Sequence, residues 1–228
     1  MSKLLLISSS RVHGSEFLEH CRSGIAEHFK GIKRVLFIPY ALADQDRYRD
    51  LVAEAFSVMD ITIESIHDAD DPIQAVDNAA GIFVGGGNTF RLLKTLYDLA
   101  LMDPIRNAVQ RRGVPYMGSS AGTNIACPTI RTTNDMPIVE PPSFESLGLF
   151  PWQINPHFID ADPNSTHKGE TREQRIAEFH EENEIPVLGI REGSWIVVND
   201  QQRSLQGTTG MKMFRRGQKP TEVAAGPF

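Results

Sequence analysis

Short apolar runs alternate with amphipathic stretches along most of this chain, and this alternation is the feature that most restricts its fold. The apolar runs occupy residues 3–9, 34–40, 61–66, 79–87, 114–118, 185–190 and 194–198. Helical patterns occupy 15–30 and about 46–59, and two more begin near Asn88 and at Ala121. Strands that alternate with helices of this length form βαβ units around a mostly parallel sheet. Because the runs are continuously apolar, we expect strands buried on both faces.

The chain of 228 residues is long enough for one α/β domain with a full core. Its sequence has no internal repeat, low-complexity tract or linker, so we predict a single catalytic domain over residues 1–228. Segment 128–170 differs from the rest because it is rich in Pro, Asn, Asp and Thr and has little helical periodicity. Long irregular segments inside a compact domain are usually functional.

Charge and cysteine content exclude several classes of protein. The net charge of −6 argues against a nucleic-acid partner, since such proteins usually have a basic face. The N-terminal apolar run, Leu4 to Ile7, is too short for a signal-peptide core or a membrane span. The two cysteines, Cys21 and Cys127, form neither a disulfide framework nor a zinc spacing. We therefore expect a cytoplasmic protein with no metal, no cofactor and no membrane contact.

The stretch Gly118-Ser119-Ser120-Ala121-Gly122 has the form G-x-S-x-G, with Ser120 at the central position. In the nucleophile elbow, a strained turn between a strand and a helix exposes the oxygen of that serine. An apolar run precedes the stretch and a helical pattern follows it, which is the context that the elbow requires. The simpler interpretation is a glycine turn with a serine N-cap. Ser119 is the neighbour of the candidate nucleophile.

A second glycine loop, Gly85 to Gly87, follows a predicted strand, and Asn88 opens the next helix. Glycines at such a place let backbone N–H groups approach a ligand closely. The loop matches neither the dinucleotide-binding nor the Walker pattern. Three interpretations stay open: a phosphate cradle, an oxyanion donor at Gly87, and a plain loop with Asn88 as N-cap.

A catalytic serine needs a base that takes its proton. The sequence has seven histidines, and we interpret His20, His28 and His180, which lie in helical stretches, as surface residues. His157 follows Pro156 at the end of an apolar segment and is the preferred candidate for the base. His167 is the second choice.

The base in turn needs a carboxylate that orients it. Glu192 lies directly beyond the buried run 185–190, at what we predict to be the same sheet edge as Ser120. Asp135 lies in the irregular stretch "RTTNDMP" and is the alternative. The residues themselves do not decide between the two carboxylates.

Thr171 and Gln174 form a capping box that begins a helix, so Arg172 falls in its first turn. A cation is unfavourable there against the helix dipole. This local penalty makes Arg172 a candidate anion ligand, although an exposed arginine is the simpler interpretation.

Five motifs occur together in this chain: "VGGGNTF", "GSSAG", "ACPTIRTTNDMPIV", "INPHF" and "HKGETREQRI". In this order they resemble the peptidase E family, the aspartyl dipeptidases. The resemblance extends from the first predicted strand to about residue 200. Ser119 departs from the pattern, because some relatives have a bulky Trp before the nucleophile.

The resemblance implies a flavodoxin-like α/β sandwich, similar to class I glutamine amidotransferase domains. It also implies hydrolysis of dipeptides with an N-terminal aspartate, with no cofactor. Ser120 matches the nucleophile position of the family, His157 the base, and either Glu192 or Asp135 the acid. The implied oxyanion donors are the N–H groups of Gly87 and Ala121, and the implied substrate-pocket residues are Asn88, Thr89 and Arg172.

Two other functions remain open from the sequence. One is a cyanophycinase-like hydrolase that uses the same serine on β-aspartyl peptides. The other is a non-catalytic amidotransferase-like binding domain whose Gly85–Gly87 loop holds a nucleotide. The sequence does not fix the oligomeric state, for which we consider a homodimer.

Overall fold

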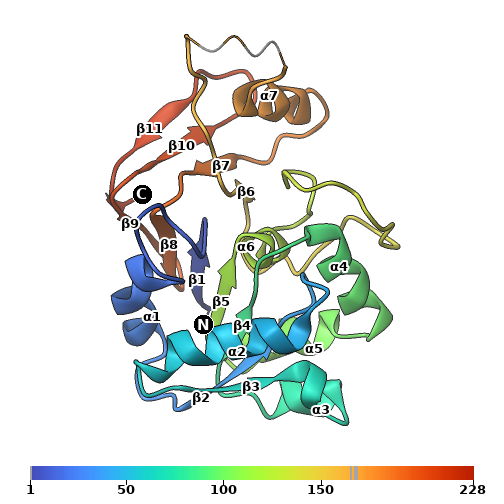
Figure 1. Ribbon diagram of the computed structural model, residues 1–228. Coiled ribbons are helices and arrows are strands. Elements are labelled where there is room, and N and C mark those ends of the chain that lie inside the picture. The colour runs from blue at the N-terminus through green and yellow to red at the C-terminus, as the bar shows by residue number, and fades with distance from the viewer. Residues whose placement is uncertain (1, 165, 167–168) are drawn as a thin grey trace.

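The computed structural model describes residues 2–164, 166 and 169–228, and an eight-stranded sheet forms its centre (Figure 1). The strand order is β12-β9-β8-β1-β5-β4-β2-β3. Its strands are β1 (Lys3–Ile7), β2 (Arg34–Ile38), β3 (Thr62–Ser65), β4 (Ile82–Val84), β5 (Tyr116–Ser119), β8 (Ser194–Asn199), β9 (Gln202–Gly207) and β12 (Gly226–Pro227). The pairings among β1 to β5 are parallel, and those that add β8, β9 and β12 are antiparallel.

Helices cover both faces of this sheet (Figure 1). They are α1 (Arg22–His28), α2 (Gln45–Ser57), α3 (Pro72–Asp77), α4 (Thr89–Asp98), α5 (Met102–Arg106) and α6 (Ala121–Ala126). Leu5 and Ile7 of β1 belong to the apolar core on the side of α1 and α2, whereas Leu4 and Leu6 belong to the core on the side of α3 to α6. Successive side chains of a strand point to opposite faces, so one apolar run supplies two cores. The predicted α/β sandwich with a mostly parallel sheet is thereby confirmed.

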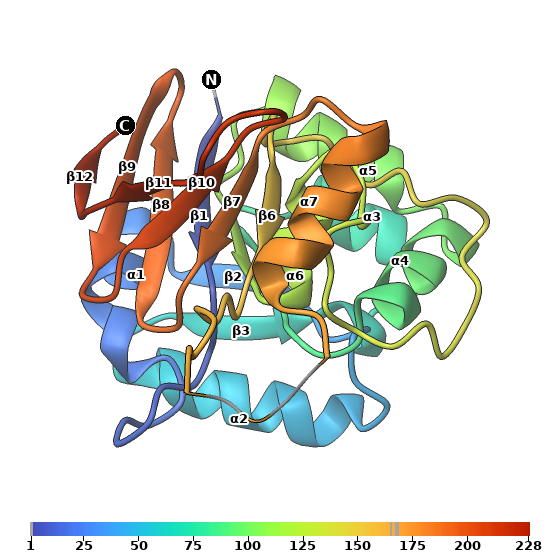
Figure 2. The same cartoon turned by 90° about the horizontal axis from the view of Figure 1, so that it is seen from above.

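A second sheet has the strand order β11-β10-β7-β6 and is covered by α7 (Arg172–Glu182) (Figure 2). Its strands are β6 (Gln153–Asn155), β7 (Val187–Ile190), β10 (Met211–Phe214) and β11 (Thr221–Val223). Val187 of β7 packs in a small core with Ile176 of α7, while Leu188 and Ile190 belong to the main core. Our expectation that run 185–190 lies in the same sheet as the strand before Ser120 was therefore wrong. The apolar run indicates burial on both faces but not which sheet contains it.

The first predicted helix is shorter than its sequence pattern. A 3-10 turn at Glu19–Cys21 precedes α1, and Leu18 has a φ of 59°. The apolar side chains at helical spacing in this stretch, Leu18, Cys21, Ile25 and Phe29, are nonetheless buried. Both cysteines are free and buried. None of the described helices combines the length and apolar composition needed to cross a bilayer.

The assignment of three histidines to the surface was also wrong. His28 and His180 are 4% and 8% exposed, and His20 is partly buried beside Trp195. An imidazole ring has enough apolar surface to face the core, and a helical pattern read without its neighbours does not reveal this. These three rings belong to the packed interior rather than to the solvated face.

We expect His28 to make the protein less stable in acid. Burial, assisted by the positive charge of Lys3, lowers the pKa of His28 from 6.5 to about 3. The unfolded chain therefore binds a proton that the folded chain does not bind, and the free energy of unfolding falls as the pH drops below about 6.5. Between pH 7 and pH 5 the loss is on the order of 2 kcal/mol.

Urea unfolding at the two pH values measures this effect. The His28→Phe variant should lose less stability on acidification than the parent chain, whereas a variant of the exposed His13 should behave as the parent does. Equal acid losses in the parent and His28→Phe would show that His28 is not responsible.

Candidate active site

Ser120 occupies a strained turn between β5 and α6. It has φ 53° and ψ −108°, a conformation that non-glycine residues rarely adopt. Its N–H donates to the Ile7 carbonyl of β1 at 3.0 Å. A Cβ atom at Gly122 would lie 2.1 Å from the Val84 carbonyl oxygen, so only glycine fits there. The glycines of G-x-S-x-G thus permit the close packing that the predicted elbow requires.

His157 and Glu192 continue a chain of hydrogen bonds from Ser120. The Ser120 Oγ lies 2.9 Å from Nε2 of His157, and Nδ1 of the same ring lies 2.6 Å from Oε1 of Glu192. When Nδ1–H donates to Glu192, the neutral ring presents its Nε2 lone pair to the serine hydroxyl. The side chains of His157 and Glu192 are 36% and 50% exposed, so this site opens to solvent.

The three residues come together at the junction of the two sheets. His157 lies two residues beyond the end of β6 at Asn155, and Glu192 lies two residues beyond the end of β7 at Ile190. Because β6 and β7 are parallel neighbours, their carboxyl ends place base and acid side by side. His157 and Glu192 therefore share a strand edge of the second sheet, whereas Ser120 follows a strand of the main sheet, so Glu192 does not lie at the sheet edge of Ser120 as predicted.

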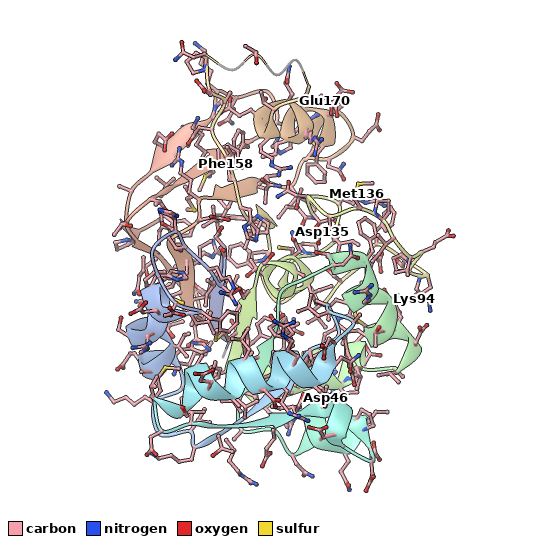
Figure 3. All side chains as sticks on the ribbon, viewed as in Figure 1. Asp46, Lys94, Asp135, Met136, Phe158 and Glu170 are labelled. Carbon is pink, nitrogen blue, oxygen red and sulfur yellow. The ribbon has the colours of Figure 1, made fainter. Side chains whose placement is uncertain are left out.

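Asp135 lies at a different place, beside the N-terminus of α4 (Figure 3). Its Oδ2 accepts hydrogen bonds from the N–H of Thr89 at 2.7 Å and from its hydroxyl at 2.5 Å. Asn88 caps α4 by accepting from Arg91 N–H, and its Nδ2 donates to the Met136 carbonyl at 2.8 Å. Within the described residues Asp135 has no hydrogen bond to His157, and the carboxylate that bonds Nδ1 is that of Glu192.

The Gly85–Gly87 loop lies against the elbow. A Cβ atom at Gly86 would lie 3.1 Å from Cβ of Ser120, so the backbone of this loop approaches the candidate nucleophile closely. The N–H of Gly86 donates to the buried phenol oxygen of Tyr48 at 2.8 Å. In the part of the chain that the structure describes, the N–H groups of Gly87 and Ala121 donate to no protein acceptor outside regular secondary structure. Neither of the two N–H groups predicted as oxyanion donors is thus occupied by such an acceptor.

Arg172 is the first residue of α7, and the capping box predicted from Thr171 and Gln174 is present. Burial, followed by the charge of Arg175, lowers the pKa of Arg172 from its ordinary value. Arg172 and Arg175 line an open cavity of about 660 Å³ together with Asn134 and Met136. The side chain of Asn134 also donates to the Pro156 carbonyl at 2.7 Å, which connects the wall of this cavity to the residue before His157. His167, the second choice for the base, lies outside the described residues.

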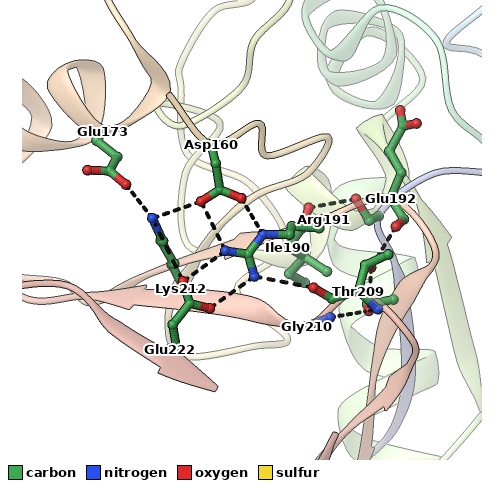
Figure 4. A network of polar contacts seen from close by, with 11 residues as sticks. Asp160, Glu173, Ile190, Arg191, Glu192, Thr209, Gly210, Lys212 and Glu222 are labelled. Atoms are coloured by element: carbon green, nitrogen blue, oxygen red, sulfur yellow. Dashed lines mark hydrogen bonds and ion pairs between the residues drawn. The ribbon is translucent and has the colours of Figure 1, made fainter. Parts of the chain in front are cut away.

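A network of five charged side chains holds the segments that bear these residues together (Figure 4). Arg191 donates to both carboxylate oxygens of Asp160, at 2.6 and 3.0 Å, and to both of Glu222, at 3.0 and 2.9 Å. Lys212 Nζ lies 2.7 Å from Glu173 and 2.8 Å from Asp160. The hydrogen bonds from Arg191 are the main cause that lowers the pKa of Asp160 to about 2. The network joins the neighbours of Arg172 and Glu192 to the segment that follows His157.

Sequence reasoning missed several residues that shape this site. Tyr48 lies within a helix, and no motif distinguishes it before the fold brings it to Gly86. Ser8, whose hydroxyl oxygen accepts from the N–H of His157 at 2.9 Å, belongs to the run "SSS" after the first strand, where its position at a sheet edge was the available signal. Thr209, whose hydroxyl donates to the Glu192 carbonyl at 2.6 Å, lies in the C-terminal part that the motifs do not reach.

A serine, a histidine and a carboxylate, linked in this order at a strand–turn–helix elbow, are the arrangement found in serine hydrolases. The chain belongs to peptidase family S51, whose model matches residues 4–206. The resemblance to the peptidase E family is thereby confirmed.

Two relatives extend this comparison over almost the whole chain. "Peptidase E" of Streptomyces coelicolor is 53% identical over 98% of this chain and 91% of its own length. "Probable alpha-aspartyl dipeptidase" of Drosophila melanogaster is 49% identical over 97% of this chain and 93% of its own length. The crystal structure of a peptidase from an acI-B1 Actinobacterium matches 100% of this chain and 97% of its own, with a TM-score of 0.70 and 19% identity, which shows the shared fold.

Proposed function

We propose that this chain is a serine dipeptidase that hydrolyses dipeptides with an N-terminal aspartate through an acyl-enzyme on Ser120. The observation that carries the proposal is the continuous hydrogen-bonded chain from Ser120 through His157 to Glu192. The names of the S51 relatives, peptidase E and alpha-aspartyl dipeptidase, support the substrate class. The partner is therefore a small peptide, and the single-domain organisation, the cytoplasmic location and a homodimer stay predictions.

In the first half-reaction, His157 takes the proton of Ser120 while the oxygen attacks the carbonyl carbon of the scissile bond. Glu192 keeps the proton of His157 on Nδ1 and stabilises the imidazolium ion that forms. The N–H groups of Gly87 and Ala121 donate to the oxyanion of the tetrahedral intermediate. Loss of one such donor costs roughly 3–4 kcal/mol of transition-state stabilisation in serine peptidases.

His157 then protonates the amine of the leaving amino acid, and the peptide bond breaks to give an aspartyl ester of Ser120. In the second half-reaction, His157 removes a proton from a water molecule, which attacks the ester carbonyl. The ester bond breaks, Ser120 recovers its proton from His157, and free aspartate leaves. No metal or cofactor enters any step.

Arg172 is the proposed ligand of the aspartate side chain, because a guanidinium ion binds a carboxylate with two parallel hydrogen bonds. Asn88 and Thr89 line the proposed pocket at the N-terminus of α4. Asp135, which is fixed there by Thr89, is the proposed ligand of the free ammonium group of the substrate. The two charges of an N-terminal aspartate would then face opposite charges of the protein.

The Arg172→Ala variant should cleave Asp-Leu at least about tenfold less efficiently, since a hydrogen bond to a charged group contributes about 1.5–3 kcal/mol. Cleavage of Asn-Leu, which does not have the side-chain charge, should change little, so the preference for aspartate should fall. The measurement is kcat/KM for both dipeptides. Arg175→Ala is the matched control on the same helix, because Arg175 already pairs with Glu170 at 3.5 Å. An Arg172→Ala protein as active on Asp-Leu as the parent chain would refute this role.

Release of free leucine from three peptides separates the proposed function from its alternatives. The purified chain should cleave α-linked Asp-Leu faster than Asn-Leu and faster than β-linked Asp-Leu. Preference for the β-linked peptide would favour the cyanophycinase-like hydrolase. No release from any of them, with nucleotide binding at the Gly85–Gly87 loop, would favour the binding domain.

A further inference from the structure

One peptide plane, between Pro156 and His157, is held by side chains on both of its polar edges. The Pro156 carbonyl accepts a hydrogen bond from Nδ2 of Asn134 at 2.7 Å. The His157 N–H donates to Oγ of Ser8 at 2.9 Å. In a trans peptide the carbonyl and the N–H point in opposite directions, so the two side chains hydrogen-bond to this peptide group from opposite sides.

Ser8 is itself fixed in the interior. It is 0% exposed, and its hydroxyl donates to the Ile190 carbonyl at 2.8 Å, which leaves an oxygen lone pair for His157 N–H. Ile190 ends the strand that leads to Glu192, two residues further on. One buried hydroxyl therefore connects the backbone of the candidate base to the backbone that presents the candidate acid.

Asn134 is fixed from the other side. Its Oδ1 accepts from Nδ2 of Asn155 at 2.8 Å, and Asn155 also donates to the Thr132 carbonyl at 2.9 Å. With Oδ1 occupied by this donor, Nδ2 is the atom that faces the Pro156 carbonyl. The stretch "RTTND" thus contacts the backbone that precedes His157, through the Asn134 side chain, and not the imidazole ring.

The residue that follows this hydrogen-bonded peptide plane, His157, has a strained backbone. His157 has a φ of 52°, a left-handed conformation that is costly for a residue other than glycine. Relaxation of φ to the ordinary negative range requires rotation about the N–Cα bond of His157, in which the peptide plane and the Cα atom with its imidazole turn relative to each other, and this would shift the ring from its place between Ser120 and Glu192. The hydrogen bonds from Ser8 and Asn134 oppose this rotation because either edge would lose its partner.

We propose that Ser8 and Asn134 are positioning residues that lock the strained backbone of His157, so that its ring stays between Ser120 and Glu192. The proposal rests on the proposed function in one respect, which is that His157 is the base. Neither side chain touches the reacting atoms. Their removal therefore changes the fraction of molecules in which the base is aligned, rather than the affinity for the peptide.

The test compares Ser8→Ala and Asn134→Ala with two control variants of buried neighbours. Ser9→Ala removes the adjacent hydroxyl, which donates to Arg11, and Thr132→Val removes a hydroxyl that donates to the Ile154 carbonyl. For Asp-Leu, kcat should fall about 10- to 100-fold in both test variants, because small misplacements of a catalytic group cost up to about 100-fold. KM should stay within about twofold of the parent value, and both controls should keep the parent kcat.

A second measurement does not depend on the dipeptide. The rate at which a fluorophosphonate modifies Ser120 should fall by a similar factor in both test variants, because this reaction also needs the base. Unchanged kcat and labelling rate in a folded Ser8→Ala or Asn134→Ala protein would overturn the proposal, as would a rise in KM alone. A parent chain that is labelled at Ser120 but does not cleave Asp-Leu would contradict the proposed substrate, while the labelling rates would still test the positioning role.

Discussion

Ser120→Ala should lower kcat for Asp-Leu by about a million-fold, the size of loss found when a serine peptidase loses its nucleophile. The variant keeps the elbow but has no oxygen to form the acyl-enzyme. The remaining rate would come from the oxyanion donors and from substrate binding alone. Aspartate release at saturating Asp-Leu measures this loss, and thermal unfolding checks that the variant is folded.

Ser119→Ala is the matched control for this prediction. The Ser119 side chain is fully buried, and within the described residues its hydroxyl has no hydrogen-bond partner. Its removal should therefore leave kcat close to the parent value. A Ser120→Ala protein that still turned over Asp-Leu at a tenth of the parent rate would exclude Ser120 as the nucleophile.

Glu192→Gln should lower kcat for Asp-Leu by about 10³- to 10⁴-fold, as changes of the triad acid do in other serine peptidases. A neutral amide neither fixes the proton on Nδ1 of His157 nor stabilises the imidazolium ion. KM should change little, because Glu192 is hydrogen-bonded to His157 and is not proposed to contact the peptide. Steady-state kinetics on Asp-Leu separate the two constants.

Asp135→Asn is the variant with which Glu192→Gln is compared, since both changes replace one carboxylate oxygen with an amide nitrogen. Because Asp135 accepts a hydrogen bond from Thr89 and is proposed to bind the substrate ammonium group, the Asp135→Asn substitution should raise KM more than it lowers kcat. The opposite pattern, with kcat lost mainly in Asp135→Asn, would exchange the roles of the two carboxylates.

Much of the main sheet could be predicted because its strands are buried on both faces. The runs that include Leu4–Ile7 and Ile82–Val84 are continuously apolar, which in an α/β chain indicates parallel strands between two helical layers. The second sheet could not be predicted in the same way. Three of its strands, β6, β10 and β11, contain polar residues and so have no continuously apolar run, and β7 looks the same as a strand of the main sheet until its partners are known.

In the candidate site, too, the features set by neighbouring residues could be predicted, whereas those set by contacts between distant parts of the chain could not. The elbow at Ser120 follows from a five-residue pattern, because glycines at fixed positions are needed for one local turn. The choice between Glu192 and Asp135 depends on which carboxylate reaches Nδ1 of His157, and that is set by the pairing of β6 with β7. The hydrogen bond from His157 N–H to Ser8 joins residues 149 positions apart, so no local pattern could indicate it.

Covalent labelling tests the central claim most directly. The purified chain would be treated with a phosphonate analogue of aspartate, digested, and analysed by mass spectrometry to locate the modified residue. We expect one adduct per chain, on Ser120, with loss of Asp-Leu hydrolysis in proportion to labelling. Full hydrolysis by a chain labelled at Ser120, or stoichiometric labelling of another residue, would contradict it.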